Sequence, residues 1–379
     1  MGTDFGAVEF RLGWGDFKLL LDPRFGAERR GDFEALLRPV APPGGGIWVA
    51  SSGTTRKEGT GYRFIALTEA ALVTSAQAVN AHLAATKEDI FVSCLPDFHV
   101  GGLGLQVRAA LLGARFVRSA GNARPWSALE FARDVEANRG TILSLVPTQV
   151  VDLVRAGIAA PSCVRVVVVG GGALSFREYQ EGRALGWPLL PSYGCTECSS
   201  QIATASLESL QTHRGSTLPP LKLLSHIEAR EEEGALLIRS RALFSCAASL
   251  MDDSVTVEPL APGAWFQTSD RVAIEGDTIA PLGRVDDLIK IGGEGVNLHE
   301  LSLLVRDIRE VISMQGDVLL RAIPDERFGN VLSLRVTNAA LGEVIRERFN
   351  EQVLPFAQIR SVELVEVIER TALGKLKRG

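Results

Sequence analysis

Hydrophobic positions along the chain change their period at two places, near Gly194 and near Gly283. Between Phe64 and Gly194, strand-length apolar runs alternate with stretches of helical period. Predicted helices are 68–84 (with Thr68 as N-cap), 103–112 and 126–138, and predicted strands are 90–95, 142–146 and 164–169. The valine-rich last run is typical of a strand buried on both faces. This alternation predicts a parallel sheet covered by helices.

The regions before Phe64 and after Gly194 have different hydrophobic patterns. Before Phe64 the pattern predicts a hairpin of 8–12 with 17–21, a short helix at 32–40, a linker at 42–46 and a strand at 47–50. After Gly194, short strands such as 234–238 and a hairpin at Gly276-Asp277 predict a small β-subdomain. After Gly283, the pattern predicts helices at 298–308 and 341–350 and strands at 318–323, 331–336 and 362–367. The expected fold class is therefore α/β: a large N-terminal domain at 1–283 and a small α+β C-terminal domain at 284–379.

Composition narrows the function classes. The chain has 379 residues, of which 46% are hydrophobic and 22% charged. Its net charge is −5 and no run of Lys and Arg forms a basic stripe, so a nucleic acid is not expected as a partner. Its apolar runs are far shorter than the roughly 20 residues that cross a bilayer, so no membrane insertion is expected. The N-terminus has no basic segment followed by an apolar one, and five scattered cysteines suit a reducing compartment. A cytoplasmic location is expected.

Cys195 and Cys198 have the spacing of a redox pair or half a zinc site. A zinc site needs two further ligands at similar spacing, and no second Cys pair or His pair occurs. Redox or metal use of this pair is therefore disfavoured.

A small, hydroxyl-bearing segment follows the strand at 47–50. It consists of Ser51, Ser52, Gly53, Thr54 and Thr55. A glycine lets the backbone turn tightly with its N–H groups inward, and hydroxyls add donors, which suits phosphate. The alternative is a solvent-exposed turn.

Ser51 to Thr55 resembles the nucleotide-binding loop of the acyl-adenylating superfamily, which comprises acyl- and aryl-CoA synthetases, peptide-synthetase adenylation domains and luciferases. That family continues with Gly, any residue, Pro and Lys, whereas this chain has Arg56, Lys57, Glu58 and Gly59. The lysine expected to meet the β- and γ-phosphates is thus missing from its position.

Further motifs follow in the family's order, and the resemblance implies a role for each. The glycines of Gly170-Gly171-Gly172 face adenine, near which Tyr193 stacks. Thr196 meets the α-phosphate and Glu197 holds Mg²⁺, since a hard cation prefers carboxylate oxygen. For Glu197, the alternative is a surface glutamate in a turn.

The later motifs concern the ribose, the hinge and catalysis. Asp270, in a Thr-Ser-Asp where the family usually has Thr-Gly-Asp, and Arg284 are the expected ribose ligands. Asp286 is the expected hinge, and Lys290 the lysine of the thioester half-reaction. Lys375 matches the catalytic lysine, a mobile cation between attacking carboxylate and α-phosphate, although basic termini are more often solvated tails.

His99 lies in an aromatic-His-x-x-Gly stretch that borders the acyl pocket in the family, although a lone His is as often a satisfied core or loop residue. Gln149 and the run 199–201 are candidates for polar contacts to the acid. No arginine can be placed there from the sequence.

The resemblance implies ATP- and Mg²⁺-dependent activation of a carboxylic acid as an acyl-adenylate, then transfer to CoA as co-substrate. The nucleotide loop is reached after only 50 residues, which resembles the short bacterial o-succinylbenzoate-CoA ligases of menaquinone synthesis. A small aromatic acid, with o-succinylbenzoate first, is therefore expected. Two alternatives are an enzyme that loads a separate carrier protein and a degenerate nucleotide-binding paralogue. The expected partners are the acid and CoA, and a homodimer is left open.

Overall fold

The computed structural model describes residues 17–42, 45–50, 61–119, 126–251, 254–370 and 376, and only the backbone of residues 24, 61 and 286. Two compact units are described separately. The first unit comprises Met1–Ala229, Ile238–Phe266 and Glu275–Ile279, and the second comprises Arg230–Leu237, Gln267–Ile274 and Ala280–Gly379.

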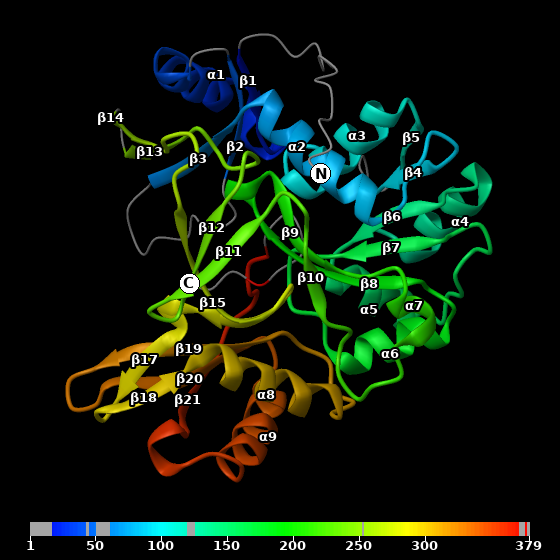
Figure 1. The fold of residues 1–379 in the computed structure, drawn as a ribbon. Coiled ribbons are helices and arrows are strands. Elements are labelled where there is room, and N and C mark those ends of the chain that lie inside the picture. The colour runs from blue at the N-terminus through cyan, green and yellow to red at the C-terminus, as the bar shows by residue number, and fades with distance from the viewer. Residues whose placement is uncertain are drawn as a thin grey trace. The chain divides into compact units, whose positions relative to one another are not determined.

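A parallel sheet forms the centre of the first unit, as the alternating pattern predicts (Figure 1). Its parallel strands, in spatial order, are β5 (Arg115–Arg118), β4 (Ile90–Ser93), β6 (Ile142–Leu145), β7 (Val166–Val169) and β8 (Leu189–Cys195). The antiparallel strands β9 (Ser200–Ala205) and β10 (Leu221–Leu223) follow β8, and β16 (Thr278–Arg284) begins beside β10. Every residue of β6 and β7 is buried, which explains the all-valine sequence of β7 and why Ser144 is the single polar residue of β6.

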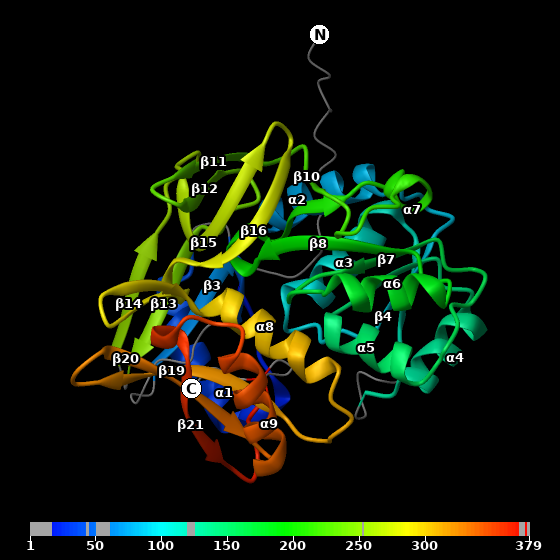
Figure 2. The ribbon, with the colours of Figure 1, turned by 90° about the horizontal axis from the view of Figure 1, so that it is seen from below.

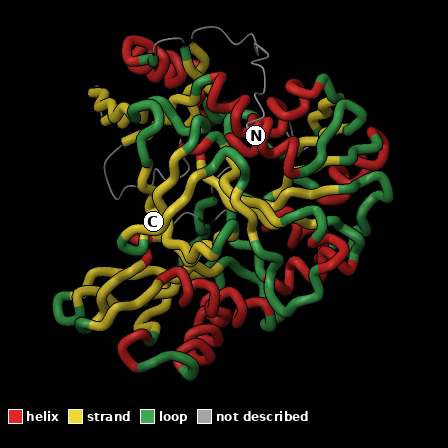
Figure 3. Tube along the Cα trace, viewed as in Figure 1, coloured by secondary structure: helices red, strands yellow, loops and turns green. Residues whose placement is uncertain are grey.

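Helices cover both faces of this sheet (Figure 3). They are α2 (Glu69–His82), α3 (Val100–Leu112), α4 (Ala128–Asn138), α5 (Pro147–Arg155) and α6 (Phe176–Ala184). Helices α2 and α3 share a buried cluster with Ile142, Val166 and Val168 on one face. On the other face, Gly182 of α6 lies so close to Leu189 that an added Cβ would sit 2.7 Å from its Cδ1. Thr68 caps α2 as expected, its hydroxyl accepting the Ala71 N–H at 3.1 Å.

A second sheet of the first unit carries the strand that precedes residues 51–60. Its order is β1 (Phe17–Leu20), β2 (Gly46–Ala50), β3 (Gly61–Leu67), β13 (Cys246–Met251) and β14 (Ser254–Pro259). Strands β2 and β3 are antiparallel, with Ala50 opposite Phe64, so residues 51–60 connect neighbouring strands. β1 pairs in parallel with β2, and the other half of the predicted hairpin, 8–12, lies outside the described residues.

The predicted helix at 32–40 differs most from the structure in its bounds. In place of 32–40, α1 spans Gly26–Leu37 and a 3-10 turn follows at Arg38–Val40. Only Phe33 and Leu37 are buried, so the first turns of α1 carry no apolar period that a sequence pattern can detect. Pro39 is the physical reason why the α-helix ends.

The second unit contains the two helices and three strands predicted after Gly283, the last strand at 359–364 rather than 362–367, together with a hairpin that was not predicted. These are the hairpin β17 (Leu288–Ile291) and β18 (Glu294–Asn297), α8 (Leu298–Glu310), β19 (Val318–Asp325), β20 (Gly329–Val336), α9 (Ala339–Asn350) and β21 (Ile359–Leu364). Helices α8 and α9 pack beside the sheet β19-β20-β21 around Leu334, Ile345 and Phe349 (Figure 2). This unit also receives parts of the earlier strands β11 (Glu228–Glu232), β12 (Ala235–Arg239), β15 (Phe266–Glu275) and β16; Gly276-Asp277 links β15 to β16, as predicted.

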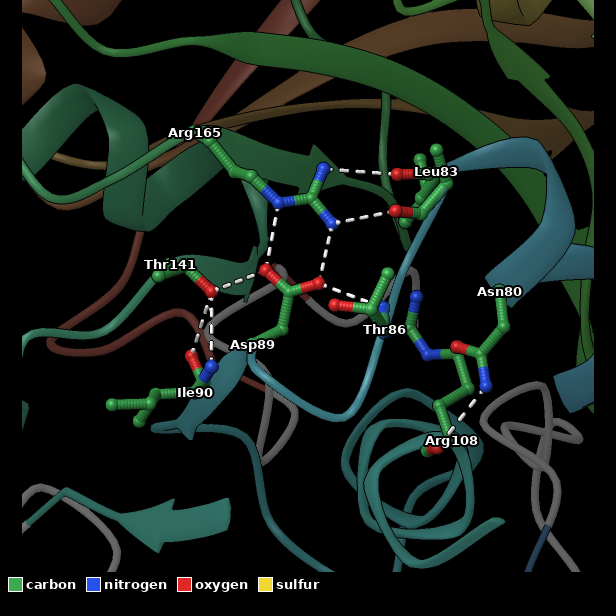
Figure 4. A network of polar contacts seen from close by, with 9 residues as sticks. Asn80, Leu83, Thr86, Asp89, Ile90, Arg108, Thr141 and Arg165 are labelled. Atoms are coloured by element: carbon green, nitrogen blue, oxygen red, sulfur yellow. Dashed lines mark hydrogen bonds and ion pairs between the residues drawn. The ribbon is translucent and has the colours of Figure 1, made fainter. Parts of the chain in front are cut away.

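A polar network holds the amino ends of β4, β6 and β7 together (Figure 4). Asp89 accepts two hydrogen bonds of 2.7 Å from Arg165, through Nε and Nη2, and one of 2.7 Å from the Thr141 hydroxyl. The Thr86 N–H adds a fourth at 2.9 Å. Burial raises the pKa of Asp89, but the Arg165, Thr86 and Thr141 contacts lower it by more, so this pKa lies below its ordinary value.

Across the described ranges, no helix has both the length and the apolar character needed to cross a membrane.

Candidate active site

The glycine turn lies at the carboxyl end of β7. The Gly170 N–H donates to Leu145 O at 3.1 Å, and a Cβ added to Gly170 would lie 3.5 Å from Ser192 O. The turn therefore runs alongside β8, one residue before Tyr193. Gly171 has φ +78°, a conformation that favours glycine, and Gly171 and Gly172 are exposed. In open α/β sheets, ligands bind at this edge.

The end of β8 forms a bulged turn. The register between β8 and β9 shifts at Tyr193/Gly194, and a Cβ at Gly194 would lie 1.7 Å from Ser200 O, so only glycine fits there. A 3-10 turn then spans Thr196–Cys198. Tyr193, Thr196 and Glu197 are all half-buried. The structure thus brings the predicted adenine, α-phosphate and metal residues to the same edge of one sheet.

Magnesium fits the donor set of this turn. Among the described residues, no group of three or more His, Cys, Asp or Glu side chains is arranged to hold a metal ion. Mg²⁺ is commonly bound by one or two carboxylates plus substrate phosphates and water, so a single carboxylate is a sufficient protein ligand. Glu197 is the residue that would hold the ion.

Cys198 is buried, and its thiol has a raised pKa. Burial, and after it the charge of Glu197, raises the pKa of Cys198 to about 12. The thiol is therefore neutral at pH 7, whereas a nucleophile or metal ligand must be a thiolate.

Helix α3 and its N-cap carry the residue predicted on the acyl side. His99 is its N-cap residue and is half-buried, with its ring centroid 4.7 Å from that of Phe98. Gly102 allows the close approach of the preceding segment, because an added Cβ would lie 2.4 Å from Pro96 O.

Arg108, further along α3, is a functional candidate that the sequence reading missed. Arg108 is 3% exposed, and its Nη2 donates to Ser144 Oγ of β6 at 3.2 Å. Its Nη1 is buried with no hydrogen-bond partner among the described residues, and no described carboxylate forms an ion pair with it. Burial lowers the pKa of Arg108 to about 10, so the side chain is still charged at pH 7.

The surroundings of Arg108 are otherwise apolar or neutral. Its Cζ lies 6.0 Å from the Phe91 ring, and its backbone oxygen accepts the Asn80 Nδ2–H at 3.1 Å (Figure 4). A buried cation without a counter-charge is unfavourable, and an incoming anion would satisfy it. The only signal in the sequence was a single arginine within the apolar face of a helix. Such an arginine usually extends its charged end to solvent, so it does not by itself indicate a buried cation.

Some predicted polar contacts are already engaged with the protein. Gln149 Oε1 accepts the Val146 N–H at 3.0 Å and so caps α5, and the Ser199 hydroxyl donates to Ala242 O at 2.7 Å. Gln201 Oε1 accepts the Thr204 hydroxyl at 2.7 Å, beside a Ser192 hydroxyl that lies 2.8 Å from the same Thr204 oxygen.

In the second unit, the structure brings the two predicted ribose ligands together. Arg284 Nη1 lies 3.8 Å from Asp270 Oδ1. The turn after Arg284 is a 3-10 turn at Val285–Asp287, in which buried Asp287 accepts the Arg284 N–H at 3.2 Å. Asp286, the predicted hinge, occupies this turn, and Lys290 is exposed on β17.

The remaining predicted residues, Ser51, Ser52, Gly53, Thr54, Thr55 and Lys375, together with Arg56, Lys57 and Gly59, lie outside the described residues.

Comparison with known proteins defines the class. Residues 64–246 match the family described as AMP-binding enzyme, and this range contains His99, Arg108, the glycine turn and the Tyr193–Glu197 turn. This part of the chain is therefore similar to AMP-binding enzymes, in agreement with the resemblance stated from the motifs.

Particular relatives are named 2-succinylbenzoate–CoA ligase. That of Staphylococcus epidermidis is 25% identical over 323 residues, covering 80% of this chain and 65% of the relative. That of Bacillus thuringiensis subsp. konkukian is 26% identical over 364 residues, covering 87% and 68%. This chain thus matches about two thirds of the length of these relatives.

Solved structures share the fold. The o-succinylbenzoate CoA synthetase (MenE) of Bacillus subtilis, in complex with the acyl-adenylate intermediate OSB-AMP, is 22% identical with a TM-score of 0.69, covering 87% of this chain and 67% of that one. ATP-bound MatB of Rhodopseudomonas palustris is 19% identical with a TM-score of 0.67, covering 87% and 66%. The predicted α/β fold class is confirmed.

Proposed function

We propose that this chain is an AMP-forming acid-CoA ligase whose acid is o-succinylbenzoate. The AMP-binding domain supports the adenylating chemistry, and relatives named 2-succinylbenzoate–CoA ligase support the acid. ATP, Mg²⁺ and CoA would be required.

The observation that carries the choice of acid is buried Arg108. o-Succinylbenzoate has two carboxylates, and adenylation consumes one, so the other must be recognised as an anion. The Arg108 Nη1 has no described hydrogen-bond partner, and its Nη2 donates to Ser144. A buried guanidinium in this state suits a second carboxylate, because charge-assisted hydrogen bonds are stronger than neutral ones. A fatty acid has no such group and would leave Arg108 unpaired.

The first half-reaction would join a carboxylate oxygen of the acid to the α-phosphorus of ATP, and pyrophosphate would leave. Thr196 would donate a hydrogen bond to the α-phosphate, and Lys375 would place its positive charge between the two anions. When bound, Mg²⁺ neutralises phosphate charge. Glycines 170–172 and Tyr193 would hold adenine, and Asp270 and Arg284 would hold the ribose.

In the second half-reaction, the CoA thiol would lose its proton and attack the acyl carbon, and AMP would leave. We assign this step to a rotation of a C-terminal domain at 284–379 about Asp286, which brings Lys290 into the site.

A basic aromatic cluster in the second unit supports CoA as acceptor. The Cζ atoms of Arg327 and Arg360 lie 5.1 and 5.8 Å from the Phe328 ring centroid. Phe328 O accepts the Gly292 N–H at 2.8 Å, and Gly292 follows Lys290 by two residues. Lys290, Arg327 and Arg360 are exposed, and within the described ranges none forms an ion pair. A ring flanked by cations suits the adenine and phosphates of CoA.

The test is release of AMP and pyrophosphate with o-succinylbenzoate, benzoate, 4-coumarate and a medium-chain fatty acid, each with and without CoA. We expect o-succinylbenzoate to have the highest kcat/KM and its AMP release to require CoA. Pyrophosphate exchange without turnover by free CoA would favour carrier-protein loading. No exchange with any acid would favour a degenerate paralogue.

We also infer a cytoplasmic location, supported by five cysteines that are all free. A homodimer stays a prediction, which a measurement of molecular mass by light scattering would test.

A further inference from the structure

Two consecutive non-glycine residues hold the left-handed region of φ at the end of the site turn. Ser199 has φ +55° and Ser200 has φ +131°. Such conformations are unfavourable for residues with a Cβ, and they persist only where surrounding contacts over-determine them. They also cluster at functional sites. Here they follow Glu197 by two and three residues.

Contacts from one neighbouring segment fix this turn at both ends. The Ser199 hydroxyl donates to Ala242 O at 2.7 Å, and the Phe244 N–H donates to Glu197 O at 2.9 Å. Ser199 and Ala242 are almost fully buried, at 1% and 0% exposure. Two residues of the turn are thus tied to two residues of a single strap, 242–244.

The backbone alone does not explain a serine at 199. Ser199 is the C-cap residue that follows the 3-10 turn, with φ +55° and ψ +13°, a place where glycine has no steric penalty. Serine keeps the strain and adds one group, the hydroxyl that reaches Ala242. A role for that hydroxyl is therefore to be sought in what it holds in place.

We propose that Ser199 is a positioning residue for Glu197. Its hydroxyl bond to Ala242 keeps the strained turn in one conformation and so fixes the direction in which Glu197 presents its carboxylate to a divalent cation. This inference rests on the proposed assignment of Glu197 as the magnesium ligand. Without the bond, the peptide planes between Glu197 and Ser200 relax, and the carboxylate samples directions that do not suit the ion.

The experiment compares Ser199→Gly and Ser199→Ala in the full chain. The glycine variant removes the hydroxyl and the strain together, whereas the alanine variant removes the hydroxyl and leaves the strain. Ser302→Ala is the matched control, because the Ser302 hydroxyl also donates a 2.7 Å bond to a backbone oxygen, that of Leu298, on α8. Glu197→Gln is the reference for loss of the ligand.

The readouts are calorimetric ATP affinity across a Mg²⁺ titration, ATP affinity in EDTA, and Tm. For Ser199→Gly we expect an unchanged or higher Tm, unchanged ATP affinity in EDTA, and a Mg²⁺ requirement raised by about 10-fold, as is usual when an outer contact of a metal ligand is lost. Ser302→Ala should leave the Mg²⁺ requirement unchanged.

An unchanged Mg²⁺ requirement in folded Ser199→Gly would overturn the proposal and leave Ser199 as a structural cap. If Ser199→Ala fails to fold, Ser199→Gly alone decides. If the ATP affinity of the wild-type chain does not change with Mg²⁺ concentration, the Glu197 assignment is overturned as well. Failure of o-succinylbenzoate as substrate would leave the Mg²⁺ titration, and hence this test, intact.

Discussion

Replacing Arg108 by methionine should make the protein more stable and less active on its acid. Methionine fills a similar space with a flexible apolar side chain, so little cavity is left. Because the guanidinium is buried with no described counter-charge, exchange for an apolar group of similar volume should be neutral or stabilising. The replacement of whole buried ion pairs by apolar groups is often stabilising by about 1–4 kcal/mol, which sets the scale. The lost Ser144 hydrogen bond opposes this gain by about 1 kcal/mol.

The loss of function follows from the same geometry. One charge-assisted bond from Nη1 to a carboxylate is worth about 1.5–3 kcal/mol, which corresponds to a fall in kcat/KM of about 10- to 150-fold. Benzoate, which has only the carboxylate that is adenylated, should be affected much less. The selectivity for o-succinylbenzoate over benzoate should therefore fall by nearly the whole factor.

Two assays test this reasoning: thermal unfolding, and CoA-dependent AMP release with both acids. Arg108→Lys is the matched control, since it keeps the charge and loses the forked geometry. A strongly lowered Tm in Arg108→Met would mean that the cation serves the fold. An equal loss on both acids would mean that Arg108 does not distinguish them.

Three further outcomes are expected. Lys375→Ala should abolish acyl-adenylate formation and spare thioester formation from supplied acyl-AMP, whereas equal loss in both half-reactions would refute its role. Arg360→Ala should raise KM for CoA by about 10-fold or more without changing pyrophosphate exchange, if it meets a CoA phosphate; the Arg346→Ala control, on a residue paired with Glu343, should do neither. Asp89→Asn should lower the free energy of unfolding at pH 7 by about 2–3 kcal/mol, less than for a fully buried pair because Arg165 is 33% exposed. Since the pKa of folded Asp89 lies below its unfolded value, its stabilisation is complete above the unfolded pKa and lost as pH falls through the folded one, so the two proteins should converge in acid; a gap that persists there would refute this.

Features that depend on local sequence patterns or short motifs could be predicted from the sequence. Buried valines at 166–169 and a capping threonine at 68 give local signals, so β7 and α2 could be placed. Arg108 could not, because its partner Ser144 is 36 residues away and its burial depends on how α3 packs on β6. The strained φ of Ser199 and Ser200 was equally hidden, since it arises from Ala242 and Phe244, more than 40 residues downstream.

The stabilising polar network and the energetically unfavourable residues lie at different places in the first unit. At the amino ends of β4, β6 and β7, Asp89 receives four hydrogen bonds, including two from Arg165, and its charge is fully compensated. Elsewhere in the first unit, Arg108 is buried with one nitrogen unsatisfied among the described residues, and Ser199 is strained. Unfavourable features of this kind persist when the rest of the structure is stable enough to hold them. The saturated network at the amino edge therefore helps the fold to tolerate an uncompensated cation at Arg108 and a strained turn at Ser199, the two features to which we assign functional roles.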